Sequence, residues 1–277
     1  MSIKGRIAVA VILLSAIFMS GCNKSSNEAS SNSNQPANMN SGTTTKTTST
    51  PTEPNADGTI PSGTGTEKEK PAPGKGNVQG KVFYNGQPVE GIEVKLCESF
   101  NQFMNGCGGE SYVAKTDKDG EYLIKDVTPK VYEALTAKVF NTNYYVFATS
   151  GIISAAKYKI EDGKTFFAPD TNLFKMDLKL QNPKAGAKIS GSGIEVKWDA
   201  YPDASYYKFT IQADSSSGAE TNYDYINKRV EGTSYTLDKP LAPGEYSCKV
   251  EAYNSNDIKL SESADDIKFT VTGGAAK

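Results

Sequence analysis

From Asn77 onward the chain alternates apolar and polar residues with a period of two, the spacing of a β-strand with one buried face. The alternation comes in short runs, and turn signals such as Asn85-Gly86 and Asp119-Gly120 separate them. The sequence therefore predicts an all-β fold of short strands joined by tight turns.

The expected strands fall into two groups, with a change near residue 182. The first group covers residues 78–84, 88–96, 111–116, 121–124, 131–140, 144–149, 156–160 and 174–180, and the second covers 194–199, 203–211, 233–237, 241–254 and 267–271. The Gly-rich stretch 98–110 is expected to be a loop, and residues 152–156 fit either a strand or a helix.

The N-terminus has the pattern of a secretory signal, expected over residues 1–21. Lys4 and Arg6 precede a short apolar run, and small residues precede Cys22. This arrangement resembles the lipobox of bacterial lipoproteins, which implies cleavage before Cys22, a diacylglycerol (palmitate-type) anchor on that cysteine, and the membrane as a partner. An ordinary secretory signal that contains a cysteine is the other interpretation.

Residues 22–75 are rich in Ser, Thr, Asn and Pro and contain almost no large apolar side chains. Such a segment cannot bury enough surface to offset the entropy lost on ordering. We expect a disordered tether with a root-mean-square span of roughly 40 Å. It would act as a spacer at the envelope, and its Ser, Thr and Pro content would also suit O-glycosylation.

Composition excludes several classes of function. The 277-residue chain has no histidine, which rules out Ser-His-Asp and Cys-His catalysis and His-ligated zinc. Its net charge of −2 gives no basic surface for nucleic acid. We expect no catalytic residue, metal or cofactor, although paired carboxylates stay formally possible.

Four cysteines constrain the covalent structure. With Cys22 assigned to the lipid, Cys97 and Cys107 are close in sequence and, outside the cytosol, are expected to form a disulfide. A metal site is the competing interpretation, but two thiolates are a poor zinc site. Cys248 is expected to be a small buried residue.

Three motifs in residues 76–181 point to a known fold. They are Val78-Gln79-Gly80-Lys81-Val82, the run from Asn85 to Val94, and Thr116-Asp117-Lys118-Asp119-Gly120-Glu121-Tyr122. Together they resemble the carboxypeptidase regulatory-like domain, a transthyretin-like sandwich, and this implies a β-sandwich without peptidase activity. Two features depart from the family: Pro129-Lys130-Val131-Tyr132 replaces Pro-Gly-Thr-Tyr, and the loop from Cys97 to Cys107 is an insertion.

The Asp117-x-Asp119-Gly120 stretch also invites a calcium interpretation. An EF-hand loop starting at Asp117 would need a Glu at its twelfth position, where this chain has Thr128. A hairpin turn explains the same residues.

Residues 182–277 carry a second set of motifs. Trp198 follows an alternating run, Leu241-Ala242-Pro243-Gly244-Glu245-Tyr246 marks a corner, and Val250-Glu251-Ala252-Tyr253-Asn254 follows it. They resemble a fibronectin type III domain, which implies that Trp198 is in the core and that Tyr246 is a tyrosine corner. The loop at residues 254–257 has no Arg-Gly-Asp, so integrin binding finds no support.

The sequence thus predicts a non-enzymatic, lipid-anchored surface protein that displays two tandem β-sandwiches for binding, adhesion or spacing. Its partner would be an unidentified extracellular protein or glycan. The alternative is a glycan-recognising accessory subunit of an extracellular enzyme or uptake system. Its candidate stacking residues are Tyr144, Tyr145, Tyr206, Tyr223 and Tyr225, although β-strands favour tyrosine in any case.

Overall fold

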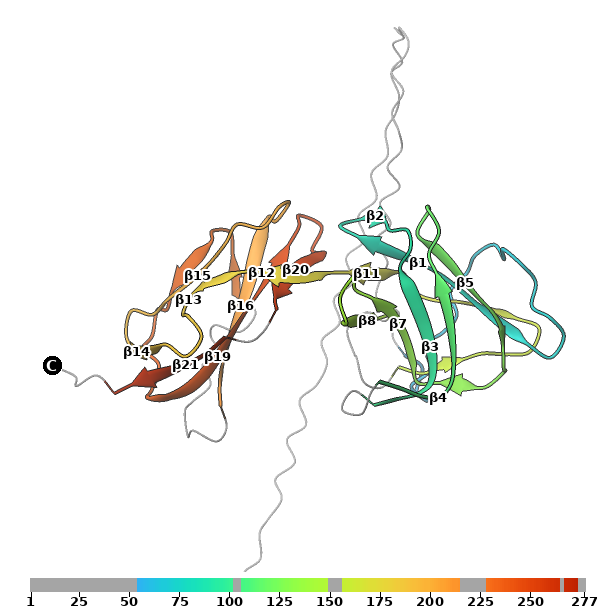
Figure 1. Ribbon diagram of the computed structural model, residues 1–277, viewed down its shortest axis with the longest axis horizontal. Helices are drawn as coiled ribbons and strands as arrows, with labels where there is room; N and C mark the ends of the chain where they lie inside the picture. Colours follow the sequence, from blue (N-terminus) through green and yellow to red (C-terminus); the bar gives the residue numbers. More distant parts are fainter. Residues whose placement is uncertain (1–53, 102–105, 149–155, 215–227, 265–266, 274–277) are drawn as a thin grey trace, which may run out of the picture. The chain divides into compact units, whose positions relative to one another are not determined.

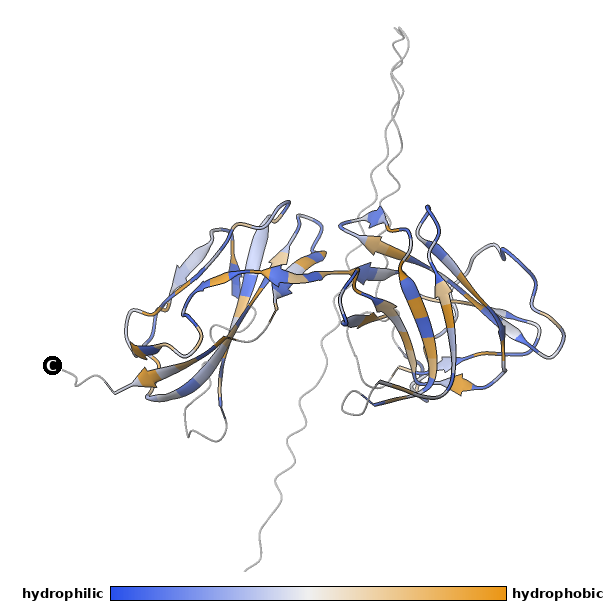
Figure 2. Cartoon of the chain, in the orientation of Figure 1, coloured by the Kyte–Doolittle hydropathy of each residue, from blue (hydrophilic) through white to orange (hydrophobic). Residues whose placement is uncertain are grey.

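The computed structural model describes residues 54–101, 106–148, 156–214, 228–264 and 267–273, and every regular element in these ranges is a β-strand (Figure 1). Apolar and polar residues alternate along many of the strands (Figure 2). The all-β prediction is confirmed. The buried hydrophobic side chains form two clusters, one from residue 60 to 173 and one from residue 178 to 271.

Two main sheets enclose the first cluster. One contains β1 (Gly76–Tyr84), β2 (Gln87–Pro88), β5 (Glu121–Val127), β10 (Thr165–Phe167) and β11 (Thr171–Leu173); the other has the order β4 (Gly106–Lys115), β3 (Glu93–Asn101), β7 (Ala134–Lys138) and β8 (Tyr145–Phe147). A short pair, β6 (Val131–Tyr132) and β9 (Tyr158–Lys159), completes this part. Because both main sheets supply buried residues to one cluster, the part from 76 to 173 is a β-sandwich.

Strand β1 is the centre of the first sandwich. On one edge it pairs antiparallel with β5, and on the other it pairs in parallel with β10 and then β11. The alternation did not reveal β10 and β11, which are three residues each. Their pairing with β1 joins segments far apart in sequence, as in the partners Asn77 and Thr165.

Residues 98–101 belong to β3 and residues 106–110 to β4, so the prediction of a loop over 98–110 is wrong for these residues; residues 102–105 lie outside the described ranges. β3 and β4 continue past both cysteines, and Phe100 pairs with Cys107. The Cys97–Cys107 disulfide is confirmed, with 5.3 Å between the two Cα atoms. The glycines allow close approach: a Cβ on Gly109, where φ is +69°, would lie 2.6 Å from a carboxylate oxygen of Glu98.

Residues 55–70, here called the strap, are packed against the first sandwich, although the tether was expected to continue to residue 75. Ile60, the one large apolar residue of the strap, is 4% exposed and belongs to the first core. Its backbone N–H donates to the carbonyl of Lys157 at 2.8 Å, and Thr59 bridges to the same residue. Two buried residues, Thr59 and Ile60, and a few backbone hydrogen bonds anchor the start of a segment whose composition indicates disorder.

The second part also has two sheets. One has the order β13 (Leu180–Asn182), β15 (Glu195–Trp198) and β18 (Ser234–Thr236). The other contains β12 (Lys175–Leu178), β14 (Lys188–Ser190), β16 (Tyr206–Ala213), β17 (Lys228–Val230), β19 (Gly244–Tyr253), β20 (Lys259–Ser263) and β21 (Ile267–Thr272). The pairing of β12 with β20 brings residues before the predicted boundary at 182 into this part.

The two aromatic residues singled out in the second part are both in its core. Trp198 is 1% exposed and packs against Tyr207 and Phe209. Tyr246 is equally buried, and its hydroxyl donates to the carbonyl of Ala242 at 3.0 Å, the hydrogen bond of a tyrosine corner. This pairing of a three-stranded sheet with a larger one is consistent with a fibronectin type III-like sandwich. Cys248 is buried in the same core.

Gly80 allows β1 to pack on Tyr122, its register partner on β5. A Cβ at Gly80 would lie 2.5 Å from the Tyr122 hydroxyl oxygen and 2.8 Å from Cζ. Tyr122 is fully buried, so the ring has little room to move.

We therefore predict that Gly80→Ala lowers the free energy of unfolding of the first sandwich by roughly 1–3 kcal/mol through overpacking. Adding Tyr122→Phe removes the closest atom and should recover part of the loss. Urea denaturation followed by circular dichroism measures both variants. Gly232→Ala, which has no atom within 4 Å of the new Cβ, is the control. If the losses of unfolding free energy caused by Gly80→Ala and Tyr122→Phe simply add in the double variant, the proposed contact is contradicted.

Candidate functional site

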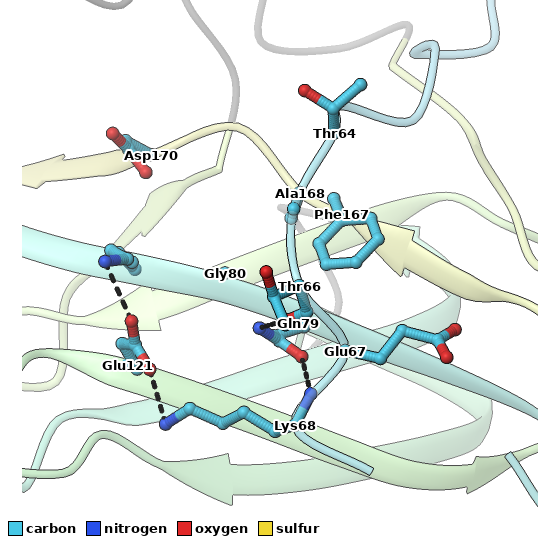
Figure 3. Close-up of a pocket in the computed structure, with 12 residues that line it drawn as sticks. Thr64, Thr66, Glu67, Lys68, Gln79, Gly80, Glu121, Phe167, Ala168 and Asp170 are labelled. Carbon is cyan, nitrogen blue, oxygen red and sulfur yellow. Dashed lines mark hydrogen bonds and ion pairs between the residues drawn. The ribbon is translucent and has the colours of Figure 1, made fainter. Parts of the chain in front are cut away.

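A concavity that brings charged groups together lies between the strap and the outer face of β1 and β5 (Figure 3). It is an open groove of about 530 Å³. Its lining residues are Thr64, Gly65, Thr66, Glu67, Lys68, Gln79, Gly80, Lys81, Glu121, Phe167, Ala168 and Asp170.

Glu121 is the central charged group of the groove. One of its carboxylate oxygens is 2.6 Å from Nζ of Lys68, and the other is 2.8 Å from Nζ of Lys81. Lys81 and Glu121 are register partners on β1 and β5, so the sheet itself places them side by side. The strap supplies Lys68, whose ion pair with Glu121 is drawn in Figure 3 and which also lies 2.6 Å from the carboxylate of Asp117.

Asp117 is held in place by the turn that precedes β5. Its other carboxylate oxygen accepts hydrogen bonds from the backbone N–H groups of Asp119 and Glu121, at 2.9 and 3.0 Å. The motif that suggested calcium is thus a tight turn that presents one carboxylate to Lys68. Among the described residues, no group of three or more potential ligands is arranged to hold a metal ion.

Side-chain amides fix the backbone of the strap. The Gln79 carbonyl oxygen accepts from the N–H of Lys68 at 3.0 Å, and its amide donates to the carbonyl of Thr66 at 3.1 Å. The buried Asn77 donates to the carbonyl of Glu69 at 3.0 Å. The strap therefore runs antiparallel to β1, held by side chains that project from that strand.

The ion pairs fix the protonation states of the cluster. The pKa of Glu121 is lowered, mainly by its hydrogen bonds to Lys68 and Lys81, and the pKa of Asp117 is lowered mainly by Lys68. The pKa values of both lysines are raised by the same contacts. Each group is held in its charged form, which is the wrong direction for a carboxylic general acid or a neutral lysine base. Burial moves Asp170 the other way and raises its pKa.

A second polar cluster braces the disulfide hairpin. Lys130 bridges the carboxylates of Glu98 and Glu110 at 2.9 and 2.8 Å, and these contacts lower the pKa of Glu110 to about 2. Tyr112 donates a short hydrogen bond to Glu110. The two departures from the resembled family, Lys130 and the Cys97–Cys107 insertion, are therefore in contact with each other.

The predicted stacking tyrosines have different environments. Tyr144 and Tyr145 are 46% and 42% exposed, so both are accessible. Tyr206 is 3% exposed, stacks on Tyr253 with ring centroids 5.1 Å apart, and has Arg229 over its ring, so its assignment as an exposed platform is wrong. Tyr223 and Tyr225 lie outside the described residues, as does Cys22.

Sequence reasoning missed the strap and its contribution of Lys68 and Gln79 to the groove. Two signals were available: the isolated apolar Ile60 in a polar segment, and the alternating charges of Glu67-Lys68-Glu69-Lys70. Alternating charges of this kind can match charges on a sheet, as Lys68 and Glu69 do with Glu121 and Lys125.

Comparison with known proteins gives no family for the chain. No family model matches it, and no curated protein sequence matches it. Solved structures with similarity include a DUF3823 family protein from Bacteroides ovatus (12% identity, 72% of this chain and all of that one, TM-score 0.24). Others are the fibronectin(III)-like modules of CbhA from Clostridium thermocellum (16%, 72% and 93%, TM-score 0.27) and the major pilin subunit BcpA from Bacillus cereus (12%, 72% and 70%, TM-score 0.28).

TM-scores this low do not establish a shared fold. The β-sandwich assignment therefore rests on the strand pairing and the two hydrophobic cores of this chain itself. None of the described residues forms a helix with the length and hydropathy needed to cross a bilayer.

The ion-pair cluster predicts an acid-sensitive first sandwich. Because the folded-state pKa values of Asp117 and Glu121 lie below the unfolded values, their stabilisation is complete only above roughly pH 5, beyond the unfolded values. It is lost as the pH falls through the folded values. Lys68→Ala should remove much of this dependence, whereas Lys164→Ala, which breaks an exposed ion pair away from the groove, should retain it.

Thermal unfolding followed by circular dichroism between pH 6 and 2.5 makes the measurement. Fluorescence of Trp198, the single tryptophan, reports the second sandwich separately. Identical pH profiles for wild type and Lys68→Ala would show that the cluster does not stabilise the fold.

Proposed function

We propose that this chain is a non-enzymatic surface protein, anchored in the membrane by lipid on Cys22, that displays its β-sandwiches for binding, adhesion or spacing. The observation that carries the non-enzymatic part is the groove. Three of its charged side chains, Lys68, Lys81 and Glu121, neutralise one another and are held in their charged forms by ion pairs. Such a site offers shape and polar contacts to a ligand, but its pKa values are shifted away from those of an acid–base pair.

The anchoring part rests on the sequence around Cys22. A diacylated cysteine has two acyl chains, which is enough for stable membrane attachment. The polar segment after it would separate the folded part from the bilayer. Because residues 55–70 pack against the first sandwich, a spacer could not extend to residue 75 as the composition indicates. On this proposal the protein lies outside the cytoplasm, exposed at the cell surface.

A labelling experiment tests the anchor. Cells are grown with an alkyne-bearing fatty acid, and the full-length protein is recovered from membrane and soluble fractions. We predict that the wild type carries the label and sediments with membranes, and that Cys22→Ala loses both properties. Ser25→Ala, outside the lipobox, is the matched control. Unlabelled protein in the membrane fraction, unchanged by Cys22→Ala, would contradict lipid anchoring.

A second candidate, glycan recognition as an accessory subunit, is favoured by one observation. Tyr144 and Tyr145 are adjacent, aromatic and nearly half exposed. Rings at this level of exposure can stack on the apolar faces of sugars, as they do on other apolar surfaces.

Glycan-array binding by the full chain tests this candidate. We predict that Tyr144→Ala and Tyr145→Ala each lower any signal at least several-fold. Val131→Ala, which truncates a residue of similar exposure, should leave it unchanged. A signal that survives the loss of both tyrosines would exclude them as the binding residues.

A further inference from the structure

The strap differs from the rest of the first sandwich in how it is held. Only Thr59 and Ile60 are buried, while residues 62–70 are all exposed. By contrast, Val78 and Val82 on the underlying β1 are 0% exposed. Segments with few buried apolar contacts and exposed hydrogen bonds open at lower free energy than the core beneath them. The strap therefore meets the physical criteria for opening while the sandwich stays folded.

The surface under the strap is complementary to it in charge and shape. Lys68 meets Glu121 and Asp117, and Glu69 meets Lys125 at 3.1 Å. Gly65 lies directly over the Phe167 ring: a Cβ there would be 2.7 Å from two of the ring carbons. This face therefore fits an extended segment with a glycine at the ring and a lysine followed by a glutamate further along.

The segment between the strap and β1 is suited to act as a hinge. It reads Lys70-Pro71-Ala72-Pro73-Gly74-Lys75 and closes with a hydrogen bond from the N–H of Lys75 to the carbonyl of Ala72 at 3.0 Å. Gly74 has φ of +75° and nothing within 4 Å of its Cβ position, so its conformation can change without a clash. The two prolines favour an extended chain once this turn opens.

We propose that the strap opens as a unit and exchanges between two copies of the chain, each strap docking on the β1–β5 face of the other copy. The segment that best fits this face is a strap, because the strap of the same chain already makes matching contacts with it. A strap from a second copy would make the same contacts. The residues that join the strap to β1, 71–75, reach about 17 Å when extended, and this is the length available for the strap to cross to a neighbouring molecule. Exchange of identical elements forms dimers with little cost in contacts.

The exchange does not require the lipid. Strap exchange could therefore fail its test while lipid anchoring holds, and lipid anchoring could fail its test while strap exchange holds. It would, however, join neighbouring molecules wherever the chain is concentrated.

A pair of charge-reversed chains provides the test. In the first, Lys68→Glu places a carboxylate of the strap against Glu121 of its own face. In the second, Glu121→Lys places an ammonium group on the face against its own Lys68. Only exchange between the two chains restores opposite charges at both faces.

The readout is native mass spectrometry of the full chains, with one chain isotopically labelled. We expect each variant alone to be mainly monomeric and the equimolar mixture to contain at least tenfold more heterodimer than either homodimer. A mixture made with Lys164→Ala in place of Lys68→Glu is the matched control and should show no such preference. Equal dimer content in all mixtures, or none in any, would overturn the proposal.

A second measurement covers the case in which a variant does not fold. Labelled and unlabelled wild-type chains are mixed at high concentration at about pH 3.5 and are returned to neutral pH. This pH is below the ordinary pKa range of carboxylates, so protonation of Asp117 and Glu121 once they leave Lys68 favours the open strap. Mixed dimers that persist on dilution are expected. In the same sample, hydrogen exchange should show the amides of Ile60, Gly63 and Lys68 opening before those of β1. Simultaneous opening of the strap and β1 would contradict a detachable strap.

Discussion

The pairing of β1 on both edges is the constraint on which the first sandwich depends. β5 binds one edge, β10 and β11 bind the other, and the strap crosses its outer face. Successive residues of this strand point alternately to the core face and to the outer face of the sheet. Val78 and Val82 point into the core, while Gln79 and Lys81 project outward to the strap and groove. The same nine residues therefore contribute both to the stability of the sandwich and to the position of the charged cluster that includes Lys68 of the strap.

Sequence patterns predicted the features that depend on local order. Alternation located most of the long strands, the Asp117–Gly120 turn is present, and the spacing of Cys97 and Cys107 gave the disulfide. The strands that were missed, β10 and β11, are short and acquire their conformation by pairing with a distant strand. The glycines between the cysteines were taken as signs of a loop. The glycines of this hairpin lie within its strands, and two of them, Gly106 and Gly109, adopt a positive φ there.

The candidate site was less accessible to sequence reasoning because it depends on contacts between distant segments. Glu121 belonged to a motif that suggested a turn, but its partner Lys68 was assigned to a disordered tether. Burial of the single residue Ile60 contributes about 1.5–3 kcal/mol, and this offsets part of the entropy of ordering the strap. Tyr206 illustrates the opposite error, since a tyrosine that alternation placed on an outer face is covered by Arg229 and Tyr253.

The strap is part of the folded first sandwich and not of a disordered tether. The most direct test compares two chains in thermal unfolding, one that starts at residue 54 and one that starts at residue 76. We predict that loss of the strap lowers the melting temperature of the first sandwich by several degrees, through loss of Ile60 and the Lys68 ion pairs. Trp198 fluorescence should show an unchanged second sandwich. Equal melting temperatures for the first sandwich in both chains would contradict the claim.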